Sequence, residues 1–223
     1  MELRAVTAGY GGADVVKGIS LRFQPGEVTV LAGPNGCGKS TLLRAAARLL
    51  PLRGGQVLVD GVDTAGWSSR AFARQAALLP QSRPVPEITV EALVLHGRFP
   101  YLGYPRRYGP ADRAAARSAM ERAGVLELAD RNVARLSGGQ RQKVYLAMAL
   151  AQDTPVLLLD EPTTFLDIGC QLELARLMRE TAAEGKAVVM VLHDLNLALG
   201  CAHRVAVMEE GRLRAWGTPA EIY

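Results

Sequence analysis

Residues 28–40 read VTVLAGPNGCGKS, a compact apolar strand followed by a glycine-rich loop. The last eight residues match the pattern GxxxxGK[ST] at every fixed position. Residues 41–50 are predicted to form a helix, so the motif lies between a strand and a helix, as it requires. In such a loop, backbone N–H groups and the positive end of the helix point at phosphate oxygens. The sequence therefore predicts an α/β protein that binds a nucleotide.

The loop residues have different expected tasks. Lys39 is expected to contact the β- and γ-phosphates, and Ser40 to bind Mg²⁺. Cys37 is expected to contribute its backbone N–H, since its thiol has no required chemistry there. A glycine-rich turn with a surface lysine is the alternative, and it leaves both the spacing and the context unexplained. The ATP contacts predicted from this stretch are Gly33, Pro34, Asn35, Gly36, Cys37, Gly38, Lys39, Ser40 and Thr41.

Two carboxylates follow a second apolar run. Residues 156–159 are all Val or Leu and lead into Asp160 and Glu161. At the carboxyl edge of a parallel sheet both acids would face the phosphate loop. We expect Asp160 to bind Mg²⁺, directly or through water, and Glu161 to polarise the water that attacks the γ-phosphate. The alternative is that the acids only cap the next turn.

The composition of the chain limits its domain size, its binding partners and its cellular compartment. The chain has 223 residues, 49% of them hydrophobic, so it can bury one substantial core. A formal net charge of +4 is too small to choose among nucleotide, nucleic acid and anionic lipid. Three cysteines without a CxxC pair argue against a disulfide framework or zinc cage and favour a reducing compartment. No apolar signal core or membrane-length apolar stretch is present, so a membrane role would need a partner.

The remaining patterns divide the chain into regions. Residues 4–7 and 19–23 alternate as strands of an antiparallel N-terminal sheet. Residues 80–110 contain six prolines and are predicted to be loop with short helices, and residues 112–129 are predicted to be helix. A helical lobe inserted over about residues 84–153 is expected. Further strands are predicted at 57–59, 76–79, 156–159, 187–192 and 205–208.

Residues 136–140, Leu-Ser-Gly-Gly-Gln, resemble the signature of ABC ATPases. Physically they begin a helix, with Ser137 as the cap. The resemblance implies a P-loop NTPase (RecA-like) core with an antiparallel β subdomain, over residues 1–83 and 154–223, and a helical subdomain over 84–153. It also implies a head-to-tail homodimer with two ATP molecules between the subunits. The residues expected to contact the ATP of the opposite subunit are Ser137, Gly138, Gly139 and Gln140.

Four single residues match the same family in order. Tyr10 resembles the aromatic residue that stacks on adenine, and Gln81 the residue that senses Mg²⁺ and the attacking water. His193 resembles the histidine that contacts the γ-phosphate, and Asp167 the aspartate that organises the dimer interface. Each also has an ordinary explanation: packing for Tyr10, a turn for Gln81, a surface position for His193 and a helix cap for Asp167.

Neighbouring residues resemble one branch of the family. Residues 160–167 (DEPTTFLD), 193–196 (HDLN) and 97–100 (GRFP) look like importers of iron siderophores, haem or cobalamin. This implies permease subunits as partners, an indirect link to a substrate-binding protein, and a peripheral position on the cytoplasmic face of the membrane. The aromatic and basic residues 99–108 would receive a permease helix, although they could also stack bases or form a solvated loop. Gly169-Cys170 departs from the pattern, and the early end at Tyr223 leaves C-terminal regulatory contacts open.

Three rival functions remain at this stage. An ABC motor for another cargo, or for export, would share every catalytic residue and differ only in its permease. An ABC protein acting on ribosomes or nucleic acid usually needs tandem domains or a long coiled coil, so no nucleic-acid partner is expected. A small-molecule kinase would fit the phosphate loop alone, and the 136–140 signature argues against it.

Overall fold

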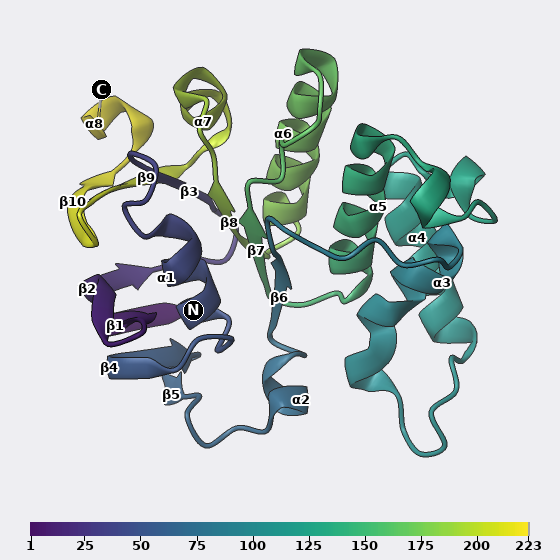
Figure 1. Cartoon of the computed structure of the whole chain (residues 1–223), viewed down its shortest axis with the longest axis horizontal. Helices are drawn as coiled ribbons and strands as arrows, with labels where there is room; N and C mark the ends of the chain where they lie inside the picture. Colours follow the sequence, from purple (N-terminus) through teal and green to yellow (C-terminus); the bar gives the residue numbers. More distant parts are fainter. Residues whose placement is uncertain (223) are drawn as a thin grey trace.

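The larger of two β-sheets carries the predicted α/β core. The computed structural model describes residues 1–222, and the larger sheet has six strands in the order β10-β9-β3-β8-β7-β6 (Figure 1). Every neighbouring pair is parallel except β10, which runs antiparallel to β9 at the edge. The strands are β3 (Val28–Ala32), β6 (Ala76–Leu79), β7 (Val156–Asp160), β8 (Ala187–Val191), β9 (Arg204–Glu209) and β10 (Arg212–Gly217).

The smaller sheet is antiparallel and contains the N-terminus. Its order is β2-β1-β4-β5, formed by β1 (Glu2–Tyr10), β2 (Ala13–Arg22), β4 (Leu52–Val59) and β5 (Val62–Asp63). The two predicted N-terminal strands do pair antiparallel, with Leu3 opposite Leu21. The strand predicted at 57–59 is the end of β4 and belongs to this sheet.

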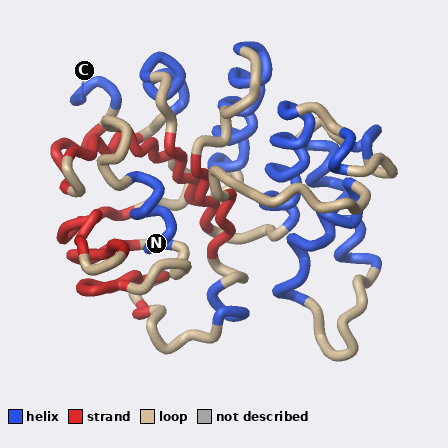
Figure 2. Tube along the Cα trace, viewed as in Figure 1, coloured by secondary structure: helices blue, strands red, loops and turns tan. Residues whose placement is uncertain are grey.

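Alternation along the central strands divides the hydrophobic core between two faces. Val28 and Val30 of β3 pack in one cluster, whereas Leu31 packs in the other. Successive strand residues point to opposite faces, so a continuous apolar run predicts a strand covered on both sides. Helix α1 (Lys39–Ala46) lies between the two sheets, and α6 (Ile168–Ala183) covers the opposite face of the large sheet (Figures 1 and 2).

The helices between residues 90 and 151 gather beyond α6, far from the small sheet (Figure 1). Their apolar residues belong to the same cluster as one face of the large sheet, with Val94 and Val144 in one cluster with Leu159. The lobe therefore shares its core with the sheet. It contains α3 (Val90–Leu95), η1 (His96–Tyr101), α4 (Pro110–Arg122), η2 (Leu126–Leu128), η3 (Val133–Arg135) and α5 (Gly138–Ala151). Shorter helices elsewhere are α2 (Ser69–Phe72), α7 (Leu195–Cys201) and α8 (Pro219–Ile222).

The predicted bounds of two helices were wrong, and one edge strand was not predicted. The helix expected over 112–129 ends at Arg122, because Gly124 adopts a φ of +64° that leaves the α-helix, and only a short 3₁₀ turn follows. The helix expected over 41–50 begins at Lys39 and ends at Ala46, with Arg48 at φ +57° just beyond it. The edge strand β10 was not predicted, because Arg212, Arg214 and Gly217 dilute its apolar pattern. Within residues 1–222, no helix combines the length and apolar character needed to cross a bilayer.

His203 connects the start of β9 to the start of β3 and makes the stability pH-dependent. Its ring Nδ1 accepts the backbone N–H of Val28 at 2.9 Å, and the backbone N–H of His203 donates to the Val28 carbonyl at 2.8 Å. Burial, with help from the Arg179 charge, lowers the pKa of His203 below its ordinary value of 6.5, against an opposing effect of Glu27. Below about pH 6.5 the unfolded chain therefore binds a proton that the folded chain resists.

We expect the free energy of unfolding to fall as the pH drops from about 6.5 through the lowered pKa of His203. In His203→Asn the side-chain amide oxygen can still accept the Val28 N–H, but it cannot titrate. Urea unfolding at pH 7.5 and 5.5 should show a smaller pH-dependent loss for the variant than for the wild type. Equal losses would assign the pH dependence to other groups.

Candidate nucleotide site

The loop between β3 and α1 folds tightly enough to require glycine at its start. Gly33 has a φ of +140°, and a Cβ there would lie 2.1 Å from the carbonyl oxygen of Met208. Lys39 begins α1 and is only 5% exposed. Its Nζ donates to the carbonyl oxygens of Gly33, at 2.7 Å, and Pro34, at 2.9 Å. The loop therefore holds its lysine ammonium at its own rim, where a phosphate would approach.

Asp160 reaches this loop from the end of β7. Its Oδ1 accepts the Ser40 hydroxyl at 2.8 Å, and the residue is 1% exposed. Burial raises the pKa of Asp160, and the Ser40 hydrogen bond opposes the rise. The Ser40 hydroxyl and the buried Asp160 carboxylate form a donor set made only of oxygen atoms. That donor chemistry fits Mg²⁺.

Glu161 is held by two other predicted site residues. Gln81 Nε2 donates to its Oε2 at 2.7 Å, and His193 Nε2 lies 2.7 Å from its Oε1. Glu161 adopts a φ of +51°, an uncommon conformation for a residue with a side chain. Gln81, Glu161 and His193 follow the carboxyl ends of β6, β7 and β8. Neighbouring parallel strands thus bring residues that are far apart in sequence to one sheet edge.

Apart from the buried Asp160, these groups face a cleft of about 400 Å³. Lys39, Ser40 and Thr41 line one part of it, and Gln81, Glu161 and His193 line another. Asn35, Gly36 and Gly38 complete the loop side, whereas Cys37 is buried behind it. Val15 of β2 also lines the cleft and was not predicted. A single valine in an ordinary strand carries no signal in the sequence.

Tyr10 and the four signature residues, all predicted to contact ATP, lie outside this cleft, and Gly33 and Pro34 of the loop do not line it either. Tyr10 is 48% exposed and its hydroxyl accepts from Arg44 Nη1 at 3.4 Å, but it is not part of the cleft lining. The signature residues begin α5, where the Ser137 hydroxyl accepts the Gln140 N–H at 3.3 Å and the Gln140 side chain accepts the Ser137 N–H at 3.1 Å. Within one chain the signature residues do not line the cleft. Their predicted contact would therefore be with ATP bound to a second subunit.

Asp167 and Phe165 follow the acidic segment and contact two different helices, α6 and the signature helix α5. Asp167 caps α6 by accepting the Cys170 N–H at 2.8 Å, and this hydrogen bond lowers the pKa of its carboxyl. Asp167 is therefore a helix cap, which was its ordinary explanation. Its role at a dimer interface stays a prediction. Phe165 is 78% exposed and packs on Gly138, where a Cβ would lie 3.2 Å from the Phe165 side chain. Glycine at the helix start thus permits this contact.

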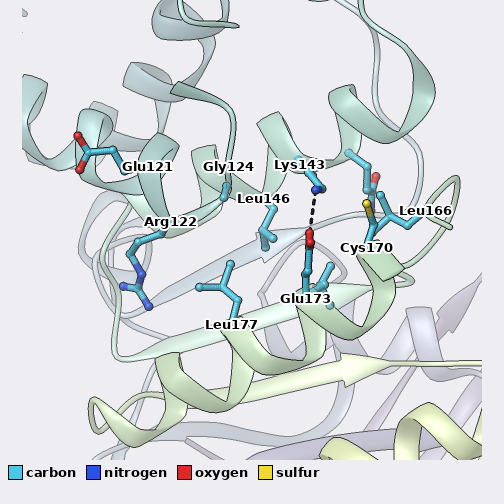
Figure 3. A pocket seen from close by; sticks show the side chains of 12 residues that line it. Glu121, Arg122, Gly124, Lys143, Leu146, Leu166, Cys170, Glu173 and Leu177 are labelled. Atoms are coloured by element: carbon cyan, nitrogen blue, oxygen red, sulfur yellow. Dashed lines mark hydrogen bonds and ion pairs between the residues drawn. The ribbon is translucent and has the colours of Figure 1, made fainter. Parts of the chain in front are cut away.

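A second cavity, of about 230 Å³, lies between α4, α5 and α6 (Figure 3). Lys143 of α5 forms an ion pair with Glu173 of α6 beside it, at 3.1 Å. Leu146 and Leu177 supply apolar lining from the same two helices. No cavity was predicted at this position, because it arises from the packing of helices that are remote in sequence.

The family model described as ABC transporter matches residues 16–164, which contain the phosphate loop, the signature and both carboxylates. The chain belongs to the ABC transporter family. Residues 136–140 had indicated this family, and the prediction is confirmed. The α/β core with its antiparallel sheet agrees as well. One solved ABC cassette, a dimer in a post-hydrolysis state bound to ADP and Pi, superposes with a TM-score of 0.86 at 28% identity, covering 98% of each chain.

Curated ABC relatives match over nearly the whole chain. The achromobactin transport ATP-binding protein of Dickeya dadantii is 46% identical, covering 98% of this chain and 82% of its own. The ferric enterobactin transport ATP-binding protein of Escherichia coli is 43% identical, covering 97% and 81%. The hemin import ATP-binding protein of Streptomyces coelicolor is 46% identical, covering 96% and 76%. This ABC protein therefore binds ATP and is an ATPase.

Proposed function

We propose that this ABC protein is the ATP-hydrolysing subunit of an importer of iron chelates such as siderophores or haem. The observation that supports the cargo class is the near full-length match, at 43–46% identity, to three subunits named for achromobactin, ferric enterobactin and hemin. Cobalamin, which the sequence left open, is not named by these three relatives. The site supports the motor, because hydrolysis needs an oriented water and charge neutralisation, and little covalent chemistry.

The chain's own residues divide the reaction between them. Lys39, at the rim of the loop, is proposed to bind the β- and γ-phosphates when it exchanges its Gly33 and Pro34 carbonyl contacts for phosphate oxygens. Glu161 is proposed to accept a hydrogen bond from the attacking water. Gln81 and His193 orient the Glu161 carboxylate from both sides, at 2.7 Å each. Orientation of this kind lowers the barrier through positioning.

Ser40 and Asp160 are proposed to hold Mg²⁺, with Gln81 nearby. When bound, the ion would neutralise charge on the β- and γ-phosphates. The 1% exposure of Asp160 keeps competing water away from its carboxylate. Its raised pKa reflects a charge that burial disfavours, and a cation would reverse that cost.

The proposed assembly is a head-to-tail homodimer on permease subunits, at the cytoplasmic face of the membrane. The signature residues lie outside the cleft of their own chain, so a second copy would have to present Ser137, Gly138, Gly139 and Gln140. Asp167 and the exposed Phe165 would then lie near the contact between the subunits. A substrate-binding protein would meet only the permease.

The cargo assignment is tested by purifying the tagged chain from membranes and identifying the permease that accompanies it. Reconstituted with that permease and its binding protein, the complex should hydrolyse ATP faster when a ferric siderophore or haem is loaded. The matched control is the same complex with the binding protein unloaded. Stimulation by an unrelated cargo would overturn the iron-chelate assignment, and recovery of RNA or ribosomes without a permease would overturn import.

A further inference from the structure

Arg83, in the segment that follows Gln81, contacts the signature helix α5. Arg83 Nη2 donates to Gln142 Oε1 at 2.8 Å, and its guanidinium lies over the Tyr145 ring, 4.4 Å from the ring centre. Tyr145 in turn donates its hydroxyl to the Pro84 carbonyl at 2.5 Å. Residues 142 and 145 are three apart and share one face of α5. That face of α5 therefore contacts two consecutive residues of the loop, Arg83 and Pro84.

Gln142 carries the connection to the acidic segment. Its Nε2 donates to the carbonyl oxygen of Pro162 at 2.7 Å, and the residue is only 5% exposed. Pro162 directly follows Glu161, so the buried amide bridges Arg83 and the backbone beside the proposed catalytic carboxylate. Since Gln142 uses both ends of its amide, loss of either partner leaves a buried polar group unpaired.

Two connections thus join the same pair of segments. Gln81 contacts Glu161 directly, and two residues later Arg83 contacts Pro162 through Gln142. The second connection passes through α5, the helix that begins with the signature. A shift of α5 relative to the sheet therefore acts on both the Gln81 loop and the end of β7.

Arg83 occupies this position at an energetic cost. Its Nη1 is buried without a hydrogen-bond partner among the described residues, and burial lowers the pKa of the guanidinium. Buried donors are rarely left unpaired in folded proteins, so such a residue calls for an explanation. A neutral side chain could fill the same space beside Tyr145 without that cost.

We propose that Arg83 is a positioning residue for ATP hydrolysis, which acts through Gln142 on the Pro162 carbonyl and so sets the place of the Glu161 carboxylate. The inference rests on the proposed catalytic role of Glu161. Through this relay the signature helix and the end of β7 move together. ATP binding by the phosphate loop does not depend on it, because neither Arg83 nor Gln142 lines the cleft.

The test compares Arg83→Met with Arg83→Lys and Gln142→Glu in steady-state ATPase assays. Arg83→Met is expected to lower kcat by about tenfold or more, the scale of one lost hydrogen bond to a charged group, with KM for ATP within about twofold. Arg83→Lys keeps a donor for Gln142 and should recover part of the loss. Gln142→Glu keeps a partner for Arg83 but loses the donor to Pro162, so it should resemble Arg83→Met.

Lys143→Met is the matched control. Lys143 neighbours Gln142 and also ties α5 to α6, through Glu173, but that carboxylate is 71% exposed and the pair does not reach Pro162. Loss of such an exposed pair changes stability little. Near wild-type kcat is expected for Lys143→Met. A loss of kcat as large as that of Arg83→Met would mean that removing an unrelated contact of α5 has the same effect, and the relay would be wrong.

A second readout does not need ATP turnover. Amide hydrogen exchange over residues 161–166 should be faster in Arg83→Met than in the wild type and Lys143→Met, with thermal unfolding as the check on folding. Unchanged exchange there, or a raised KM with unchanged kcat, would overturn the relay. If Arg83→Met does not fold, Arg83→Lys and Gln142→Glu decide by the same exchange measurement. A wild type without ATPase activity would contradict the proposed function. The relay would then be tested by the hydrogen-exchange measurement alone.

Discussion

Glu161→Gln is expected to lower ATP turnover by about 10²- to 10⁴-fold, the range found for loss of a positioned general base. The amide has nearly the shape of the carboxylate and can still meet Gln81 and His193, which lie 2.7 Å away on either side. It cannot accept the proton of the attacking water. ATP binding should therefore persist while hydrolysis stops, and the ATP-bound dimer should accumulate.

Phosphate release and size-exclusion chromatography with ATP would measure the two effects together. Glu173→Gln is a suitable control, because it makes the same chemical change on an exposed side chain of α6. Unchanged hydrolysis in Glu161→Gln would remove Glu161 from the catalytic role. Loss of hydrolysis without any ATP-dependent dimer would instead contradict the head-to-tail assembly.

Lys39→Ala is expected to weaken ATP binding by roughly 10- to 100-fold, because each hydrogen bond from a charged donor is worth about 1.5–3 kcal/mol. Turnover should fall with it. The Lys39 ammonium is 5% exposed and lies on the Gly33 and Pro34 carbonyls, so its loss also removes contacts inside the loop. Thermal unfolding without nucleotide separates that structural effect from the loss of phosphate contacts.

Equilibrium binding of a fluorescent ATP analogue would give the affinity directly. Lys17→Ala, on β2 two residues after the cleft-lining Val15, is exposed and controls for the loss of one positive charge. Normal binding and turnover in Lys39→Ala would overturn the assignment of residues 33–40 as the phosphate loop.

The strands and the motif residues were predictable because they depend on local pattern. Residues 28–32 and 156–160 are buried on both faces, and a short continuous apolar run is what such a strand requires. The Ser137 cap of α5 followed equally from local chemistry, since a serine before two glycines can accept a free N–H. Helix ends were less predictable, because single residues such as Gly124 and Arg48 decide them through positive φ angles.

The stacking of Tyr10 on adenine, inferred from its order in the chain, stays a prediction. The position of Tyr10 at the end of β1 agrees with the resemblance, but the cleft is lined by Val15 of the neighbouring strand and not by Tyr10. Which strand residue lines the cleft depends on how the small sheet packs on α1. The sequence contains no local signal for that packing.

The sequence by itself determined the family and predicted the phosphate loop and the two carboxylates, because each is a short local pattern. Only the tertiary structure decided that Gln81 and His193 hold Glu161, since parallel strands bring residues 80 and 32 positions away to one edge. It also decided the Arg83–Gln142–Pro162 relay, whose hydrogen bonds span 59 and 20 residues. Such contacts follow from packing between distant elements, which no local pattern encodes.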